Sequence, residues 1–201
     1  FILTLSDGRI GEAADLARRL IDTSDGLPVA SLLLALQHLK AGEMAAVETQ
    51  LENLGSSRGP NALLVPMVRA WALAGAGQGL EAVDLLTAVE GLRRLGPLRD
   101  MHLGMLAEFA GLMEEAEKFY RAATSDPDSL EVRTVLAYAS FLSRTNRSKQ
   151  ASALFDLHKS QNPDSILLEP WIARLGEGEE LPVVVKSPRH GAAEAIYLVA
   201  N

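Results

Sequence analysis

Histidines are the side chains in this sequence that most often bind metals or carry protons in catalysis. None of the four is followed by a second histidine or a cysteine one helical turn later, the spacing that lets two side chains face the same metal. They lie in separate segments, at His38, His102, His158 and His190. Isolated histidines of this kind are typical of core or partly buried positions, so we expect neither a metal site nor a cofactor.

Carboxylates and hydroxyls also lack the spacing that catalysis requires. Glu114 and Glu115 are adjacent, so on a helix their side chains point apart instead of sharing a proton. Ser56 and Ser57 have no accompanying pattern of histidine and aspartate. The glycine-rich stretch at 75–79 lacks the Lys-Ser/Thr ending of a phosphate-binding loop. The sequence therefore predicts no catalytic residue and a protein that is not an enzyme.

Composition excludes several classes of partner and site. The net charge of −7 argues against nucleic acid as a partner, because phosphate binding needs a basic stripe. The absence of cysteine excludes disulfides and thiolate metal sites within this chain. No run of about 18 apolar residues is present, so we expect no transmembrane segment in this chain.

The compartment is left open between the cytoplasm and the periplasm. Phe1 is not an initiator methionine, which predicts that the chain begins inside a longer protein and that the upstream sequence is missing. The excess of arginine over lysine is typical of a GC-rich bacterial source.

One pattern recurs along the chain: a turn residue followed by a stretch rich in alanine and leucine, with apolar residues at helical intervals. The turn residues are Gly8, Gly42, Gly77, Gly111 and Asn146. Their spacings are 34, 35, 34 and 35 residues. Such a fixed period near 34 residues predicts an array of helical repeats.

The unit around Gly111 resembles the tetratricopeptide repeat, a pair of antiparallel helices. The matching residues are Leu103 and Gly104, then Ala116, Tyr120 and Ala123, then Pro127. The tryptophan of the motif is absent and leucine replaces most of its aromatic residues, so the spacing is the specific part of the resemblance. The resemblance implies an all-α, right-handed superhelical solenoid of antiparallel helix pairs, with about five repeats and a C-terminal capping segment.

The period also divides the chain. The repeat array is expected over residues 1–175, and residues 176–201 are expected to form an irregular segment and a C-terminal helix that cap the array or begin a further element. The units of the array are about 1–27, 28–60, 61–96, 97–128 and 129–163, with a partial unit at 164–175. The clearest connector is the loop at 55–60, which contains two glycines and a proline. In the third unit we expect helices at 62–74 and 80–94, and Pro66 requires the first of these to begin near Leu63.

In the family that the chain resembles, the first helix of each pair lines a concave groove. The corresponding positions here are Leu32, Leu36, Met67, Trp71, Met101 and Met105. Methionine adapts to irregular apolar partners and tryptophan is a frequent interface anchor. The resemblance therefore implies a non-catalytic scaffold or adaptor that binds a protein or peptide partner, or a second copy of itself as a homodimer, in this groove.

Other interpretations remain open. The same side chains would also be apolar if they only packed against neighbouring repeats. The chain could be the non-catalytic repeat region of a larger enzyme or of a cell-envelope assembly protein, or a self-association module. The β-prone stretch Leu181–Val185 and the helical stretch Ala192–Val199 could cap the solenoid, which we favour, or fill the groove.

Overall fold

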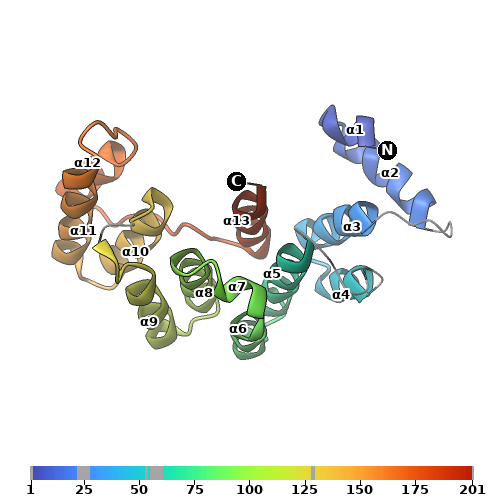
Figure 1. Ribbon diagram of the computed structural model, residues 1–201, viewed down its shortest axis with the longest axis horizontal. Helices are drawn as coiled ribbons and strands as arrows, with labels where there is room; N and C mark the ends of the chain where they lie inside the picture. The colour runs from blue at the N-terminus through green and yellow to red at the C-terminus, as the bar shows by residue number, and fades with distance from the viewer. Residues whose placement is uncertain (1, 22–27, 53, 55–60, 128–129, 201) are drawn as a thin grey trace. The chain divides into compact units, whose positions relative to one another are not determined.

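The computed structural model describes residues 2–21, 28–52, 54, 61–127 and 130–200, and every regular element among them is a helix (Figure 1). The helices are α1 (Ile2–Ser6), α2 (Ile10–Ile21), α3 (Pro28–Ala41), α4 (Met44–Glu52), α5 (Asn61–Gly75), α6 (Gly79–Ala88), α7 (Glu90–Arg93), α8 (Pro97–Phe109), α9 (Met113–Ala123), α10 (Val132–Arg144), α11 (Ser148–Gln161), α12 (Glu169–Gly176) and α13 (Pro188–Ala200). The all-α class predicted from the sequence is confirmed for this part of the chain. The expected loop at 55–60 lies outside it.

The recurring turn residues all take the same backbone conformation. Their φ angles are 72° at Gly8, 82° at Gly42, 83° at Gly77, 78° at Gly111 and 60° at Asn146. Glycine, and less readily asparagine, tolerates this left-handed region. The amide after each turn residue donates to a carbonyl five residues back, at 2.9–3.1 Å, as in the Schellman ending of a helix. The same left-handed helix ending therefore terminates the first helix of five successive pairs.

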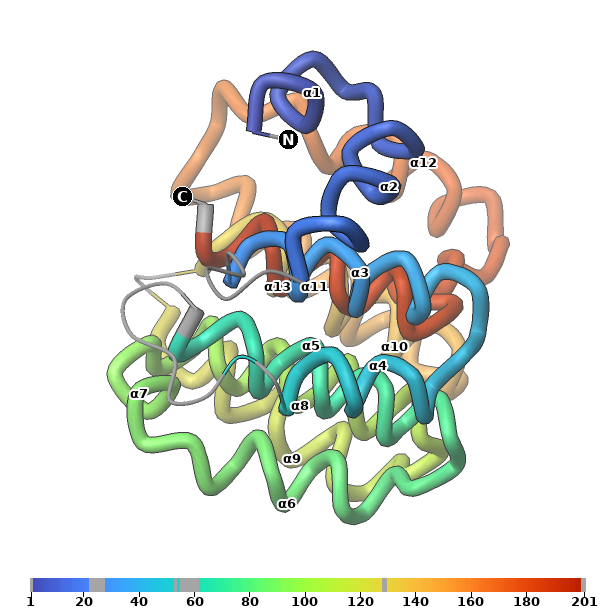
Figure 2. Tube along the Cα trace, turned by 90° about the vertical axis from the view of Figure 1, so that its right-hand side faces the viewer, coloured from blue at the N-terminus to red at the C-terminus, as the bar shows by residue number. Residues whose placement is uncertain are grey.

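The chain divides into two compact units, and the first joins Phe1–Val89 to Ser187–Asn201. Within it the helices from α1 to α6 each pack on the next, and α13 returns to pack on α5 and α3. Figure 2 shows α13 beside α3 although about 150 residues separate them in the sequence.

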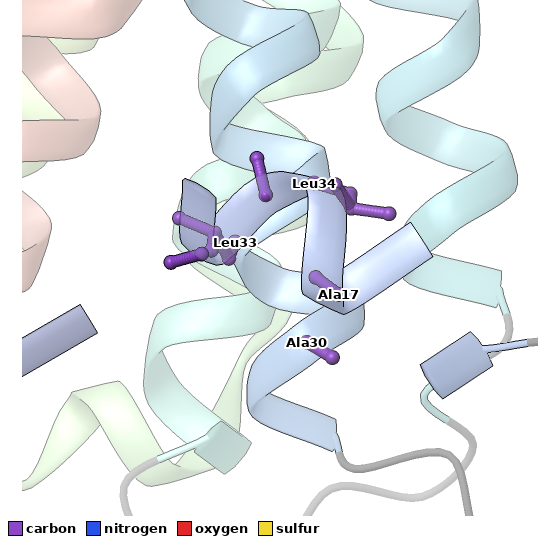
Figure 3. Close-up of a cluster of buried hydrophobic side chains, with 6 residues drawn as sticks. Ala17, Ala30, Leu33 and Leu34 are labelled. Carbon is purple, nitrogen blue, oxygen red and sulfur yellow. The ribbon is translucent and has the colours of Figure 1, made fainter. Parts of the chain in front are cut away.

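Small residues let α2 and α3 approach closely. Ala17 and Ala30 are fully buried between these helices, and Leu33 and Leu34 complete the cluster (Figure 3). Ile10, Ala13, Ala17 and Ile21 recur at helical spacing along α2, although Ile10 itself is exposed. The interface therefore forms from periodic small residues without any large aromatic side chain.

The second unit, Glu90–Lys186, has an aromatic core around Tyr120. The ring of Tyr120 on α9 lies 5.5 Å from that of Tyr138 and 5.4 Å from that of Phe141, both on α10. Gly104 on α8 makes room for it, because a Cβ there would lie 2.7 Å from Cδ1 of Tyr120. The Gly104 that carries the family resemblance is thus a position where helices approach closely.

One local expectation was wrong. The single helix expected at 80–94 is interrupted at Val89, whose extended backbone (φ −69°, ψ 105°) separates α6 from α7. Helix α5 begins at Asn61, two residues before the start near Leu63 that Pro66 was expected to require, and Pro66 lies inside its second turn. The β-prone stretch Leu181–Val185 forms no strand, and the carbonyl of Pro182 accepts a hydrogen bond from the Ser140 hydroxyl of α10.

Candidate functional site

Helix α13 covers the face of α5 on which a partner-binding groove was expected. A Cβ built on Gly191 would lie 2.0 Å from Cε2 of Trp71, so the backbone of α13 rests directly on the indole. One turn further along α5, a Cβ on Gly75 would lie 2.6 Å from Cγ of Pro188. Residue numbers rise along α5 as they fall along α13, so the two helices are antiparallel.

The buried side of α13 consists of small residues. Gly191 and Ala192 are buried, and Ala195, one turn later, is fully buried. One turn before Trp71 on α5 lies Met67, which is also fully buried. Small residues on α13 allow its axis to approach α5 closely, and the indole of Trp71 fills the space between the two helices.

The six predicted groove residues fall into both units. Met67 and Trp71 are buried in the first unit, and Leu32 is 8% exposed there. Leu36 is the only one that is half-buried. Met101 and Met105 belong to α8 in the second unit, where both are buried, and Met101 Sδ lies 3.3 Å from the Thr134 hydroxyl. The structure therefore brings four of the six together in the first unit, and of the six only Leu36 is substantially open to a ligand.

The segment before α13 packs in a similar way on α10 in the second unit. The Ser140 hydroxyl donates to the carbonyl of Pro182 at 2.6 Å, and the amide of Leu181 donates to the Ser143 hydroxyl at 3.0 Å. Leu181 and Val185 are buried. Both parts of the C-terminal segment thus contact first helices of pairs.

A polar network anchors this segment. Tyr120 donates to Glu108 Oε2 at 2.8 Å, and Arg144 forms an ion pair with the same carboxylate. Arg144 also donates to the Ser140 hydroxyl at 3.1 Å. Burial and the neighbouring Glu108 carboxylate raise the pKa of Tyr120. The charges are paired and mostly buried, which is the arrangement of a structural network and leaves no free acid or base.

His102 is a buried titratable side chain with a strongly lowered pKa. It is 1% exposed on α8, and within the described part of the chain neither ring nitrogen has a hydrogen-bond partner. Burial, together with the charge of Arg133, lowers its pKa to about 3. The ring is therefore neutral at pH 7 and sealed from any substrate. Nowhere among the described residues do three potential ligands (His, Cys, Asp or Glu) gather to hold a metal ion.

An open cleft remains beside the covered face. It has a volume of about 470 Å³ and lies between α3 and α13, with Ile10 of α2 at its edge. Leu33, Leu36 and Leu39 line it from α3, and Ile196 from α13. Lys40 and Arg189 add positive charge. Of the six residues predicted to line a groove, Leu36 is thus the one that lines this accessible apolar cleft.

The sequence pattern missed Gly191, Gly75 and Ala195, which define how α13 docks. A signal was present, since two glycines interrupt stretches that are otherwise helical in composition, and such glycines mark close approach. Their pairing could not be inferred because the contact lies outside the 34-residue period.

None of the described helices has the length and hydropathy needed to cross a membrane. No family model matches the chain, and no curated protein or solved structure is significantly similar to it.

Proposed function

We propose that the protein is a non-catalytic interaction module of the tetratricopeptide type, whose first-helix face binds a helix that presents small residues. The repeated left-handed turns, 34 or 35 residues apart, and the adjacent packed helix pairs support a right-handed solenoid of such repeats. The single observation that carries the functional proposal is the contact between Gly191 and Trp71.

On this proposal α13 occupies the binding face in the absence of a partner, and its residues indicate which side chains a partner helix needs. A competing helix needs glycine at the position of Gly191, because even the Cβ of alanine would lie 2.0 Å from Cε2 of Trp71. At the buried positions of Ala192 and Ala195 it needs residues as small as alanine. Helix-in-groove recognition commonly reads anchors at i, i+3 and i+4 spacing, and Ala195 lies at i+4 from Gly191 and at i+3 from Ala192. A partner segment would displace α13 and take over its apolar contacts.

A peptide of residues 187–199 tests this directly. In the full chain, Gly191→Leu should undock α13 and leave the α3–α5 face free to bind the labelled peptide, measured by fluorescence anisotropy. The unsubstituted chain should bind at least tenfold more weakly, because its own α13 competes at an effective concentration in the millimolar range.

The matched control is Ala193→Leu, which enlarges an exposed residue of the same helix and should behave like the unsubstituted chain. A peptide carrying Gly191→Leu should not bind. If the substituted chain keeps its helicity but takes up no peptide, the α3–α5 face is not a helix-binding site.

A further inference from the structure

The open cleft on the first unit is an apolar trough with a positively charged rim. Leu33, Leu36 and Leu39 of α3 line its floor, and Ile10 and Ile196, which are 40% and 38% exposed, lie at its edge. No aspartate or glutamate lines it, although the chain as a whole carries a net charge of −7. Within the described residues, Lys40 and Arg189 form no ion pair. An occupant of matching chemistry has apolar side chains next to a carboxylate.

The second unit exposes apolar side chains next to a carboxylate at the corner Asp164–Leu167, between α11 and α12. Ile166 is 77% exposed and Leu167 is 63% exposed. Asp164 is exposed beside them and has no ion pair in the part of the chain that the structure describes. Glu169 adds a second carboxylate, which pairs with Lys159.

The corner is held in shape before it meets any partner. Leu168 is 2% exposed and anchors it to the unit. The amide of Ser165 donates to the carbonyl of Asn162 at 3.0 Å, and that of Glu169 to Ile166 at 3.2 Å. A preformed apolar projection loses little conformational entropy on binding.

Other exposed apolar residues fit the trough less well. Ile2 and Leu3 on α1 are also adjacent and exposed, but the nearest carboxylate in sequence, Asp7, is paired with Arg9. Leu80 on α6 is a single exposed side chain. The corner Asp164–Leu167 alone combines two neighbouring apolar side chains with an unpaired carboxylate among the described residues.

We infer that the corner Asp164–Leu167 of one copy inserts into the trough of a second copy, with Ile166 and Leu167 on the leucine floor and Asp164 near Lys40 and Arg189. Two different surfaces meet in this contact, so a single contact leaves one corner and one trough free. Further contacts of the same kind give open chains or closed rings, of which a reciprocal pair of two copies is the smallest. The trough includes Arg189 and Ile196 of α13, so this contact requires α13 to be docked, and a helix that displaced α13 would also abolish it.

Sedimentation velocity of the full chain, from micromolar to millimolar concentration, tests it. The unsubstituted chain should show a concentration-dependent series of species larger than a monomer. Ile166→Lys places a positive charge on the corner, and Ile196→Lys places one in the trough, so each should weaken association at least tenfold. Leu80→Lys changes an apolar residue elsewhere whose exposure, 63%, lies between those of Ile166 and Ile196, and this variant should associate like the unsubstituted chain.

Mixing the two weakened variants gives the sharpest readout. The Ile166→Lys chain retains an intact trough and the Ile196→Lys chain an intact corner, so an equimolar mixture should form a one-to-one dimer that cannot extend. Circular dichroism checks that both variants keep their helices. A chain that stays monomeric at every concentration, an association that either variant leaves unchanged, or a mixture that forms no dimer would each overturn the inference.

Discussion

At the scale of single residues, glycines that look alike in the sequence have opposite roles. Gly104 and Gly11 both lie inside helices, α8 and α2. A Cβ at Gly104 would meet the ring of Tyr120 at 2.7 Å, whereas a Cβ at Gly11 would meet nothing within 4 Å. The first glycine is required by packing and the second only costs helix stability.

Alanine substitutions should separate these roles. Gly104→Ala should lower the free energy of unfolding by roughly 1–3 kcal/mol, because a fully buried ring must shift in a packed core. Gly11→Ala should raise it by about 0.5–1 kcal/mol, since alanine loses less backbone entropy in a helix. Urea unfolding measures both, and a stabilising Gly104→Ala would show that the approach of α8 and α9 is looser than described.

His102 should make stability depend on pH. Its pKa is about 3 in the folded protein, against 6.5 for an ordinary histidine, so below about pH 6.5 the unfolded chain binds a proton that the native state does not. The contribution of His102 to the free energy of unfolding is therefore complete above pH 6.5. It falls by about 1.4 kcal/mol per pH unit as the pH drops toward 3.

The matching experiment compares His102→Leu with the unsubstituted chain by urea unfolding at pH 7 and pH 5. The unsubstituted chain should lose about 2 kcal/mol more than the variant over this interval, because leucine has no proton to bind. Equal losses would mean that the ring is solvated or protonated in the native state.

At the scale of helices, the periodic features were predictable and the aperiodic ones were not. The turns at Gly42, Gly77 and Gly111 could be located because a left-handed residue has a compositional signature that recurs at a fixed interval. Asn146 could be placed in the same class only by its spacing. The break at Val89 has no such signature, since the apolar stripe continues across it to the buried Leu92.

The candidate site was predictable in part for the same reason. The resemblance placed Met67 and Trp71 on the groove side of a first helix, and the structure buries both. It could not identify what covers them. Contact between α5 and α13 joins residues about 120 positions apart, and a repeat pattern carries information only about neighbouring units.

At the scale of the whole molecule, the C-terminal segment links the two compact units by packing on first helices in each. Residues 181–185 are held by Ser140 and Ser143 of the second unit, and α13 is held by Trp71 of the first. The proposed function needs the second of these contacts to be exchangeable. A buried indole that becomes exposed when α13 leaves provides a direct reporter of that exchange.

The emission of Trp71 therefore tests the central claim most directly. Trp171→Phe leaves Trp71 as the only tryptophan in the chain, and its buried ring should emit at short wavelength and resist acrylamide quenching. Adding Gly191→Leu should shift the emission to longer wavelength and raise the quenching, and saturating peptide 187–199 should reverse both changes. Ala193→Leu should leave both unchanged. Emission that does not respond to Gly191→Leu, in a chain that keeps its helicity, would contradict the docking of α13 on Trp71.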